Sequence, residues 1–226
     1  MSKRYERNMK ALSLSENERL RGFNACVVGC GGLGGYVIEH LGRLGVGRIT
    51  AVDGDVFEEN NLNRQILSSE KTLGESKAEA AKKRMEEVNS GVCVTAIREY
   101  ITEKNSEIIL KGHDIIVDAL DNVTARIIIE REAQRQGIPI IHGAIAGWYG
   151  QVSVIMPGEP LYEKLYHGSG EKGVENELGN LPFTAAAVAS IQAAETVKVL
   201  LGRDGTLAGR LLAIDLLSHG YDIFEI

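Results

Sequence analysis

Cysteine is scarce in this sequence of 226 residues, and none of its three cysteines is spaced for pairing. Cys26, Cys30 and Cys93 form no C-x-x-C motif, so the sequence predicts neither a disulfide framework nor a cysteine zinc site. Cys26 and Cys93 lie in strand-like runs and are expected in the core. Cys30 lies in a glycine-rich turn, where we expect a small filler rather than a nucleophile.

Long apolar runs and excess positive charge are also missing. The sequence has no run of about 18 apolar residues, and its N-terminal segment is too polar for a secretion signal or a membrane span. The formal net charge is -6 with no long basic tract, so broad attraction to nucleic acid is not expected. These absences predict a cytoplasmic protein that acts on small molecules or proteins, with no membrane as a partner.

What is present suits one large domain over residues 1–226, because 44% of the residues are hydrophobic and 25% are charged. Apolar strand-like runs alternate with helical patterns along the first two thirds of the chain. The predicted strands are 25–28, 48–53, 92–97, 114–120 and 138–143, and the predicted helices are 36–44, 76–89, 103–111 and 123–136. This alternation predicts a Rossmann-like α/β fold, with a mainly parallel sheet and helices on both faces.

The pattern changes near Trp148. Residues 150–156 alternate as an antiparallel strand does, and residues 157–182 are rich in glycine and charge and are predicted to form a mobile loop. A largely apolar helix follows from Pro182. Two further strand candidates, 210–217 and 221–226, are expected to extend the sheet with antiparallel strands.

A glycine-rich turn, GCGGLG at 29–34, lies between the first predicted strand and the helix after it. A helix N-terminus preceded by glycines presents free backbone N–H groups to an anion. Asp53 ends the next strand, 19 residues after Gly34, where a carboxylate can accept hydrogen bonds from ribose hydroxyls. The pattern predicts a nucleotide site, and the alternative is a turn kept only for tight packing.

The segment after Asp53 indicates which nucleotide binds. Arg64 lies in NNLNRQ at 60–65, and Lys77 opens the next helix. An NAD site needs little more cationic charge, whereas cleavage of a triphosphate needs donors for the departing pyrophosphate. These two residues therefore favour ATP, although the simpler interpretation of each is a solvated surface charge.

The motifs taken together resemble those of the ThiF/MoeB/HesA family, adenylating enzymes related to the activating enzymes of ubiquitin. The resemblance extends over nearly the whole chain, in RYER, GCGGLG, VDGD, NLNRQ, GESKAEAA, DALDN, the G-x-x-GQV segment at 147–152 and IQAAETVKVLLG. It implies ATP-dependent adenylation of the C-terminal glycine carboxylate of a small ubiquitin-like sulfur-carrier protein ending in Gly-Gly. Such carriers serve thiamine or molybdopterin synthesis, and the resemblance also implies a homodimer.

The resemblance implies a role for each matching residue. Asp53 would hold the ribose, Asn61 with Arg64 would contact ribose and phosphates, Lys77 would neutralise phosphate charge, and Asp121 of DALDN would bind Mg²⁺. The full set expected to contact ATP is Gly29, Gly31, Gly32, Gly34, Asp53, Asp55, Asn61, Arg64, Gln65, Lys77, Asp121 and Asn122.

Arg7 of RYER resembles the family arginine that reaches the γ-phosphate from the neighbouring subunit. It lies in a polar N-terminal helical arm, residues 1–22, that need not pack on its own domain. The late apolar helix and the strands beyond it are where a two-fold interface is expected.

The chain departs from many relatives in its cysteines. Those relatives carry two C-x-x-C pairs for zinc and a cysteine in the loop before the late helix, but residues 157–182 contain no cysteine. We therefore expect adenylation without a covalent carrier intermediate on that loop, and no zinc site. The histidines show no metal-ligand spacing and are expected to be structural or surface residues: His40, His113, His142, His167 and His219. Trp148 is treated in the same way, with a contact to the carrier tail as the alternative.

Three other functions stay open at this point. One is a tRNA-nucleoside dehydratase of the same superfamily, which the acidic charge balance disfavours modestly. Another is an NAD-dependent oxidoreductase, which would leave NLNRQ, Lys77 and DALDN unexplained. The third is a nucleotide-binding module without catalysis, which Arg64, Lys77 and Asp121 disfavour.

Overall fold

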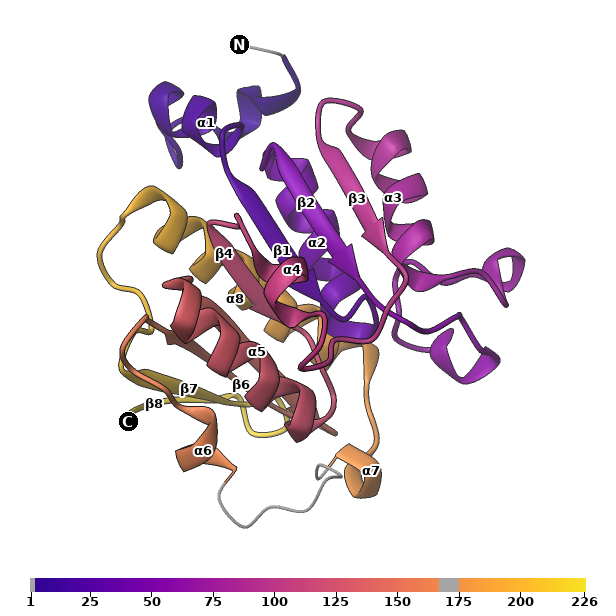
Figure 1. Ribbon diagram of the computed structural model, residues 1–226, viewed down its shortest axis with the longest axis vertical. Helices are drawn as coiled ribbons and strands as arrows, with labels where there is room; N and C mark the ends of the chain where they lie inside the picture. Colours follow the sequence, from indigo (N-terminus) through magenta and orange to yellow (C-terminus); the bar gives the residue numbers. More distant parts are fainter. Residues whose placement is uncertain (1–2, 167–174) are drawn as a thin grey trace.

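The computed structural model describes residues 3–166 and 175–226, which build one eight-stranded sheet (Figure 1). The strands are β1 (Asn24–Val28), β2 (Arg48–Val52), β3 (Cys93–Ile97), β4 (Ile115–Asp118), β5 (Ile140–Ala146), β6 (Tyr149–Ile155), β7 (Arg210–Asp215) and β8 (Gly220–Glu225). Their order is β3-β2-β1-β4-β5-β6-β7-β8. Strands β1 to β5 pair in parallel, and β6, β7 and β8 are added antiparallel. The predicted fold class is confirmed.

Most of the helices follow the order that the sequence pattern predicts, and two short ones lie in the segment 157–182, predicted to be a loop. They are α1 (Leu14–Leu20), α2 (Gly32–Leu44), α3 (Lys77–Val88), α4 (Ser106–Leu110), α5 (Val123–Gln136), α6 (Tyr162–Leu165), α7 (Glu175–Leu178) and α8 (Pro182–Leu201). Short 3-10 helices cover Lys3–Asn8, Glu59–Asn61 and Glu70–Thr72. Helix α5 has the predicted bounds, because the Asn122 side chain accepts a hydrogen bond from Ala125 N at its start and Gly137 adopts φ 70° at its end.

Two hydrophobic cores cover the two faces of the sheet. Alternate side chains of β1 point to opposite faces: Ala25 and Val27 pack with α2, α3 and α8, whereas Cys26 and Val28 pack with α4 and α5. Both faces of the parallel part are therefore buried, which explains why its strands read as continuous apolar runs.

Helix α8 owes its apolar composition to this packing. It is the one helix of the described ranges long and apolar enough to cross a membrane, and 61% of its apolar window is buried. It packs on α2, β5 and β6 of its own chain. Most of α8 is therefore internal, and three of the exposed apolar side chains beyond it lie on β8, at Tyr221, Ile223 and Phe224.

The N-terminal arm packs on its own chain, although the sequence left it free to lie elsewhere. Tyr5 is buried, its hydroxyl accepts a hydrogen bond from Asn89 Nδ2 at 2.8 Å, and its ring fills the space beside Gly45. Gly45 and Asn89 lie just before β2 and β3. The arm therefore covers the end of the sheet at which these strands begin (Figure 1).

Two further expectations need correction. Cys93 is exposed rather than in the core, because it begins the edge strand β3. The segment predicted as a mobile loop, 157–182, includes the short helices α6 and α7, and Tyr162 of α6 is fully buried. Residues 167–174 of that segment, with His167, lie outside the described residues.

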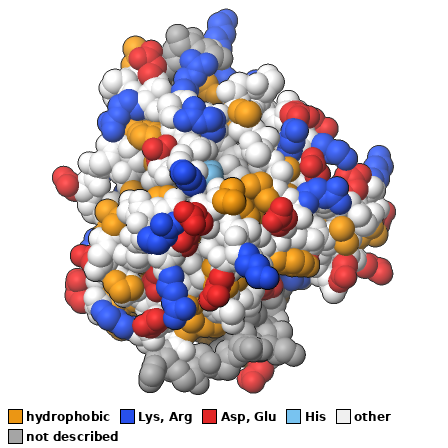
Figure 2. Space-filling model, viewed as in Figure 1, with side chains coloured by type: hydrophobic (Ala, Val, Ile, Leu, Met, Phe, Trp, Pro, Cys, Tyr) orange, Lys and Arg blue, Asp and Glu red, His pale blue; other side chains and the backbone are white. Residues whose placement is uncertain are grey.

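Charge is mixed rather than segregated on the face shown in Figure 2, where basic and acidic side chains alternate over the helices and loops. The net charge of the whole chain is -6.

Candidate active site

A cavity of about 620 Å³ opens at the carboxyl ends of β1, β2 and β4. Strand β1 lies between β2 and β4 in the sheet, so the cavity occupies the point where the strand order reverses, the usual ligand site of such sheets. The expected residues that line it are Gly29, Gly31, Gly32, Asp53, Asp55, Arg64, Gln65, Lys77, Asp121 and Asn122. The fold therefore brings together ten residues that the sequence spreads over nearly a hundred positions.

The glycine turn needs its glycines for close backbone contacts. Gly29 adopts φ 95°, and a Cβ there would lie 2.5 Å from the Ala119 carbonyl oxygen. Gly34 does not line the cavity; a Cβ on it would lie 1.8 Å from the carbonyl oxygen of Gly29, so it permits α2 to pack on the turn. Gly31 is the N-cap of α2 and has no side-chain cap, which leaves the first-turn N–H groups facing the cavity.

Asp53 ties the end of β2 to the glycine turn. Its Oδ2 accepts a hydrogen bond from Cys30 N at 2.7 Å, and its Oδ1 accepts one from Asp55 N at 2.8 Å. Burial raises the pKa of Asp53 above its ordinary value, against the lowering effect of these bonds and of Lys77. Each carboxylate oxygen keeps a further lone pair for a donor in the cavity.

Lys77 begins α3 and is buried with its ammonium group in the cavity. Its Nζ lies 3.1 Å from Asp55 Oδ2, and the Tyr100 hydroxyl donates a hydrogen bond to Asp55 Oδ1. Burial alone would raise the pKa of Asp55, but Tyr100 and Lys77 outweigh it and lower that pKa. Tyr100, which sequence reasoning missed, also lays its ring over Gly54 at the cavity wall.

Arg64 and Gln65 have side-chain polar groups whose hydrogen-bonding capacity is only partly filled by neighbouring residues. Arg64 NH1 donates to Asn60 O and to Asn63 Oδ1, both at 3.0 Å. Gln65 is buried, and its Oε1 has no hydrogen-bond partner among the described residues. Both residues also line a smaller neighbouring cavity.

Asn61 lies in this smaller cavity rather than in the main one. Its Oδ1 accepts from Glu58 N at 3.1 Å, and its Nδ2 donates to Asn60 Oδ1 at 2.6 Å. These bonds shape the turn that carries Arg64.

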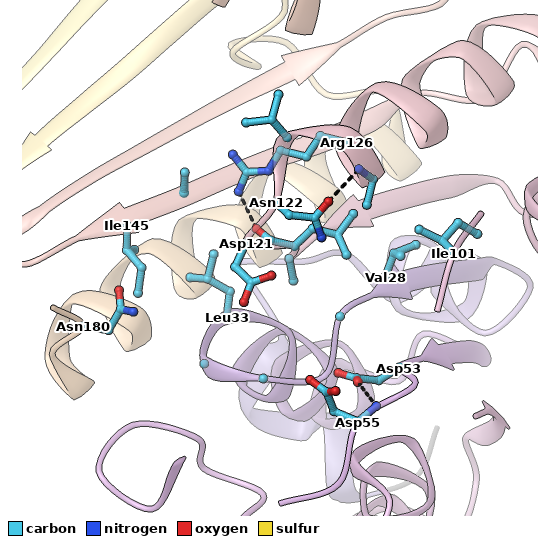
Figure 3. Close-up of a pocket in the computed structure, with 18 of the residues that line it drawn as sticks. Val28, Leu33, Asp53, Asp55, Ile101, Asp121, Asn122, Arg126, Ile145 and Asn180 are labelled. Atoms are coloured by element: carbon cyan, nitrogen blue, oxygen red, sulfur yellow. Dashed lines mark hydrogen bonds between the residues drawn. The ribbon is translucent and has the colours of Figure 1, made fainter. Parts of the chain in front are cut away.

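Asp121 lies on the loop after β4, and its carboxylate points into the cavity (Figure 3). It is exposed, and it makes no hydrogen bond or ion pair within the part of the chain that the structure describes. Asn122 also lines the cavity, but its side-chain oxygen caps α5. Asp121 is therefore the carboxylate left free for a cation.

A buried polar cluster lies behind Asp121 and was not predicted. Arg126 Nε lies 3.3 Å from Asp118 Oδ2, and the same oxygen accepts hydrogen bonds from Tyr162 Oη at 2.6 Å and from His142 Nδ1 at 3.0 Å. His142 is structural, as expected, and Gln151 Nε2 donates to its Nε2. Asp118 ends an apolar run and Arg126 lies in a charged helix, so no local pattern could indicate that they pair.

Small and apolar residues line the far end of the cavity. Ala144, Ile145 and Ala146 of β5 lie there with Gly150 of β6. Asn180 lies opposite Ile145, and its Oδ1 is buried without a hydrogen-bond partner in the described ranges (Figure 3).

The turn between β5 and β6 is fastened to the start of α8. Gly147 N donates to Gly179 O at 2.7 Å, and Thr184 Oγ1 donates to Gly147 O at 2.8 Å. The rings of Trp148 and Phe183 lie 4.8 Å apart between their centroids. Trp148 is 40% exposed and does not line the main cavity.

Arg7 lies outside the cavity of its own chain. It is exposed on the arm that Tyr5 anchors at the beginning of β2 and β3. The cavity lies past the other ends of these strands, and a five-residue strand spans about 16 Å. Arg7 therefore lies at the end of the sheet opposite its own site.

The acidic, cysteine and histidine side chains of residues 3–166 and 175–226 form no group of three or more that could hold a metal ion by themselves. A Mg²⁺ ion suits Asp121 nevertheless, because Mg²⁺ is commonly held by one or two carboxylates together with substrate phosphates and water.

Comparisons with known proteins agree with this geometry. The chain is 38% identical over 229 residues to the sulfur carrier protein adenylyltransferase of Thermus thermophilus, covering 96% of this chain and 84% of that protein. Its fold is similar to that of Escherichia coli MccB in a structure with ATP, with a TM-score of 0.85, 21% identity and coverage of 100% and 71%. It is also similar to that of the E. coli tRNA N6-threonylcarbamoyladenosine dehydratase TcdA, with a TM-score of 0.75, 23% identity and coverage of 88% and 94%. The ThiF family model matches residues 5–226, and the chain belongs to the ThiF family.

Proposed function

We propose that this chain is an ATP-dependent adenylyltransferase that activates the C-terminal glycine carboxylate of a small ubiquitin-like sulfur-carrier protein and releases pyrophosphate. One observation carries the proposal: a glycine turn, the cationic side chains of Arg64 and Lys77 and the free carboxylate of Asp121 line a single cavity. The relative from T. thermophilus, named for the same activity, supports it.

The cavity suits the adenosine part of ATP. Val28 and Ile101 lie close together in one region of the cavity (Figure 3). Leu120 also lines the cavity, and these apolar side chains suit a flat base. Asp53, beside this region, would accept hydrogen bonds from the ribose hydroxyls. The N–H groups at the start of α2 would then face the phosphates.

The phosphates would lie among the charged side chains. Arg64 would donate hydrogen bonds through its guanidinium, and Lys77 would divide its charge between Asp55 and a phosphate oxygen. Asp121 would hold Mg²⁺, which when bound supplies further neutralisation of phosphate charge.

Charge neutralisation and alignment then account for the chemistry. A bond forms between a carboxylate oxygen of the carrier and the α-phosphorus, and the bond from that phosphorus to the bridging oxygen of pyrophosphate breaks. The α-carboxyl group has a pKa of about 3.5 and is already ionised at neutral pH, so no general base is needed. Arg64 and Lys77 each stabilise the developing charge through charge-assisted hydrogen bonds of about 1.5 to 3 kcal/mol.

The carrier tail would enter along Ala144, Ala146 and Gly150, where small residues leave room for an unbranched glycine end. Of the described cysteines, Cys26 and Cys30 are buried and Cys93 lies on the edge strand β3. None lines the cavity. This arrangement supports adenylation without a covalent bond between carrier and enzyme.

Binding and exchange experiments test the proposal. Calorimetry should show binding of Mg-ATP and none of NAD, because Arg64, Lys77 and Asp121 match a triphosphate. Exchange of labelled pyrophosphate into ATP should require a carrier that ends in Gly-Gly and should stop when its last glycine is deleted. Exchange that depends on tRNA instead would favour the dehydratase alternative, and tight NAD binding without ATP binding would overturn the proposal.

A further inference from the structure

The backbone of Leu120, the residue before Asp121, is held on both sides by charged side chains. Leu120 N donates a hydrogen bond to Asp118 Oδ1 at 3.0 Å. Leu120 O accepts a hydrogen bond from Arg126 NH2, which also donates to Gly143 O at 3.0 Å. One ion pair therefore fixes both backbone polar groups of Leu120, and with them the peptide units on either side of this residue, and joins the loop to β5.

The residue after Asp121 is fixed as well. Asn122 Oδ1 accepts a hydrogen bond from Ala125 N at 2.7 Å and so attaches the loop to α5. Between these two anchors the Asp121 carboxylate has no partner among the described residues and points into the cavity, away from Arg126 (Figure 3). A fixed backbone with a free carboxylate is the arrangement expected of a preorganised metal ligand.

The guanidinium of Arg126 is committed to the protein. Arg126 is 5% exposed and Asp118 is fully buried. Besides Leu120 O and Gly143 O, the guanidinium donates to the Tyr166 hydroxyl through NH1. Its Nε is close enough to Asp118 for an ion pair, at 3.3 Å, but is not aligned for a hydrogen bond. Arg126 is among the residues that line the cavity, but these contacts engage both terminal nitrogens of its guanidinium with the protein and favour a supporting role.

A buried ion pair is weak evidence for stability, because the cost of removing both charges from water can exceed their attraction. The better physical reason for an ion pair directly behind the Asp121 loop is that it fixes the position of the backbone at Leu120. Arginine suits that task because one terminal nitrogen of its guanidinium holds both carbonyl groups while the other reaches Tyr166 and Nε lies beside Asp118, a spread of contacts that the single ammonium group of lysine does not reproduce.

We propose that Arg126 is a positioning residue for Asp121: together with Asp118 it fixes the backbone at Leu120 and so sets where the Asp121 carboxylate meets a divalent cation on bound ATP. This inference rests on the proposed function. It assigns Arg126 no contact with the nucleotide or the metal.

Metal binding tests the inference without enzymatic turnover. Free Mn²⁺ is measured by electron paramagnetic resonance during titration of the protein saturated with a non-hydrolysable ATP analogue. Arg126→Lys should raise the Kd for Mn²⁺ about tenfold, since loss of a residue that orients a metal ligand costs about 10 to 100-fold in affinity. Analogue affinity measured in excess EDTA should stay within about twofold. Arg131→Gln is the matched control, because Arg131 lies on the same helix, is 65% exposed and pairs with Glu163 of α6 at 3.4 Å; it should behave as wild type.

A double variant separates positioning from general loosening. If Arg126 acts through Asp121, then Arg126→Lys should add nothing to the effect of Asp121→Asn. Additive losses, or equal weakening of analogue binding in EDTA, would overturn the inference, and so would a wild-type Kd for Mn²⁺ in Arg126→Lys.

A second double variant, in which both buried charges are removed, tests the inference if Arg126→Lys does not fold. Asp118→Asn with Arg126→Gln leaves no unpaired buried charge, and circular dichroism should show a folded protein with the same loss of Mn²⁺ affinity. Wild-type Mn²⁺ affinity in this folded pair would overturn the inference. If the wild-type protein binds no ATP analogue, both the proposed function and this inference are overturned. If the wild-type protein binds the analogue and Mn²⁺, and only Asp121→Asn weakens Mn²⁺ binding, this inference alone is overturned.

Discussion

Lys77 Nζ lies 3.1 Å from Asp55 Oδ2, with the lysine side chain buried and the carboxylate half exposed. The ammonium group thus lies in the cavity wall with one acidic partner. A polyphosphate that enters the cavity would give Lys77 a second anionic partner. The hydrogen bond between them would be charge-assisted, and partial burial would strengthen it.

Replacement of Lys77 should therefore weaken ATP binding more than it weakens the fold. Lys77→Met should lower the affinity for Mg-ATP about tenfold to a hundredfold, the equivalent of one charge-assisted hydrogen bond of about 1.5 to 3 kcal/mol. Lys83→Met is the control, because Lys83 lies on the same helix and pairs with Glu75 at the surface at 2.9 Å. Calorimetry that shows equal affinities for the two variants would contradict the assignment of Lys77.

Two glycines of the turn should differ in their tolerance of alanine. A Cβ on Gly34 would overlap the carbonyl oxygen of Gly29 at 1.8 Å, whereas one on Gly31 would lie 3.5 Å from its nearest neighbour, Gln65 Nε2. Gly34→Ala should destabilise the fold by about 1 to 3 kcal/mol or more, as overpacking does. Gly31→Ala should keep nearly the wild-type free energy of unfolding in urea. A reversed order of stability would show that Gly34 has no packing role.

His142 should make the fold sensitive to mild acid. Burial lowers the pKa of His142, while the unfolded chain protonates this group near a pKa of about 6.5. The unfolded state therefore binds more protons below that value, so the stability is complete above about pH 6.5 and falls as the pH drops toward the lowered folded pKa. The loss is at most about 1.4 kcal/mol per pH unit for one group.

The variant His142→Asn isolates this contribution. Asparagine can donate to Asp118 but does not ionise, so the free energy of unfolding should fall less between pH 7.5 and 5.5 than in the wild type. The pKa values of His40 and His113 are also lowered by burial, and their effects remain in both proteins and cancel in the comparison. Equal pH dependence in wild type and variant would rule out the buried neutral state of His142.

The cysteines should differ in reactivity. Burial raises the pKa of Cys26 to about 12 and raises that of Cys30, so neither thiol forms a thiolate at pH 8. Cys93 is exposed. Iodoacetamide should therefore alkylate one site per native chain, identified as Cys93 by peptide mass, and three after denaturation. Rapid labelling of Cys30 in the native protein would contradict its burial.

Arg7 allows a test of a site shared between two subunits. Because Arg7 lies at the end of the sheet opposite its own cavity, the expected contact with the γ-phosphate requires a second copy of the chain. Arg7→Ala and Asp121→Ala should each abolish carrier-dependent exchange. An equimolar mixture after subunit exchange should recover about a quarter of wild-type activity, because half of the dimers are hybrids with one intact site each. No recovery after verified exchange would refute the shared site, and full activity of Arg7→Ala alone would make Arg7 a surface charge.

The sequence predicted those parts of the molecule that depend on neighbouring residues. The strand, turn and helix around Gly29 and the bounds of α5 follow from local periodicity, capping and glycine. The buried pair of Asp118 and Arg126 was missed, because a charge on a helix is usually exposed and only the tertiary fold shows otherwise. Cys93 was misplaced for a related reason: its apolar run does not reveal that β3 is an edge strand.

Trp148 is the single tryptophan of the chain, and the fold places it in the β5–β6 turn, 4.8 Å from the Phe183 ring and partly open to solvent. The intrinsic tryptophan emission of this protein therefore arises from one place, the rim between the small-residue end of the cavity and the start of α8. A carrier tail that follows the proposed path beside this rim should change the solvent exposure of the indole and shift its emission, whereas a nucleotide confined to the glycine turn should leave it unchanged. Under the proposed function, Trp148 fluorescence should therefore report binding of the carrier separately from binding of ATP.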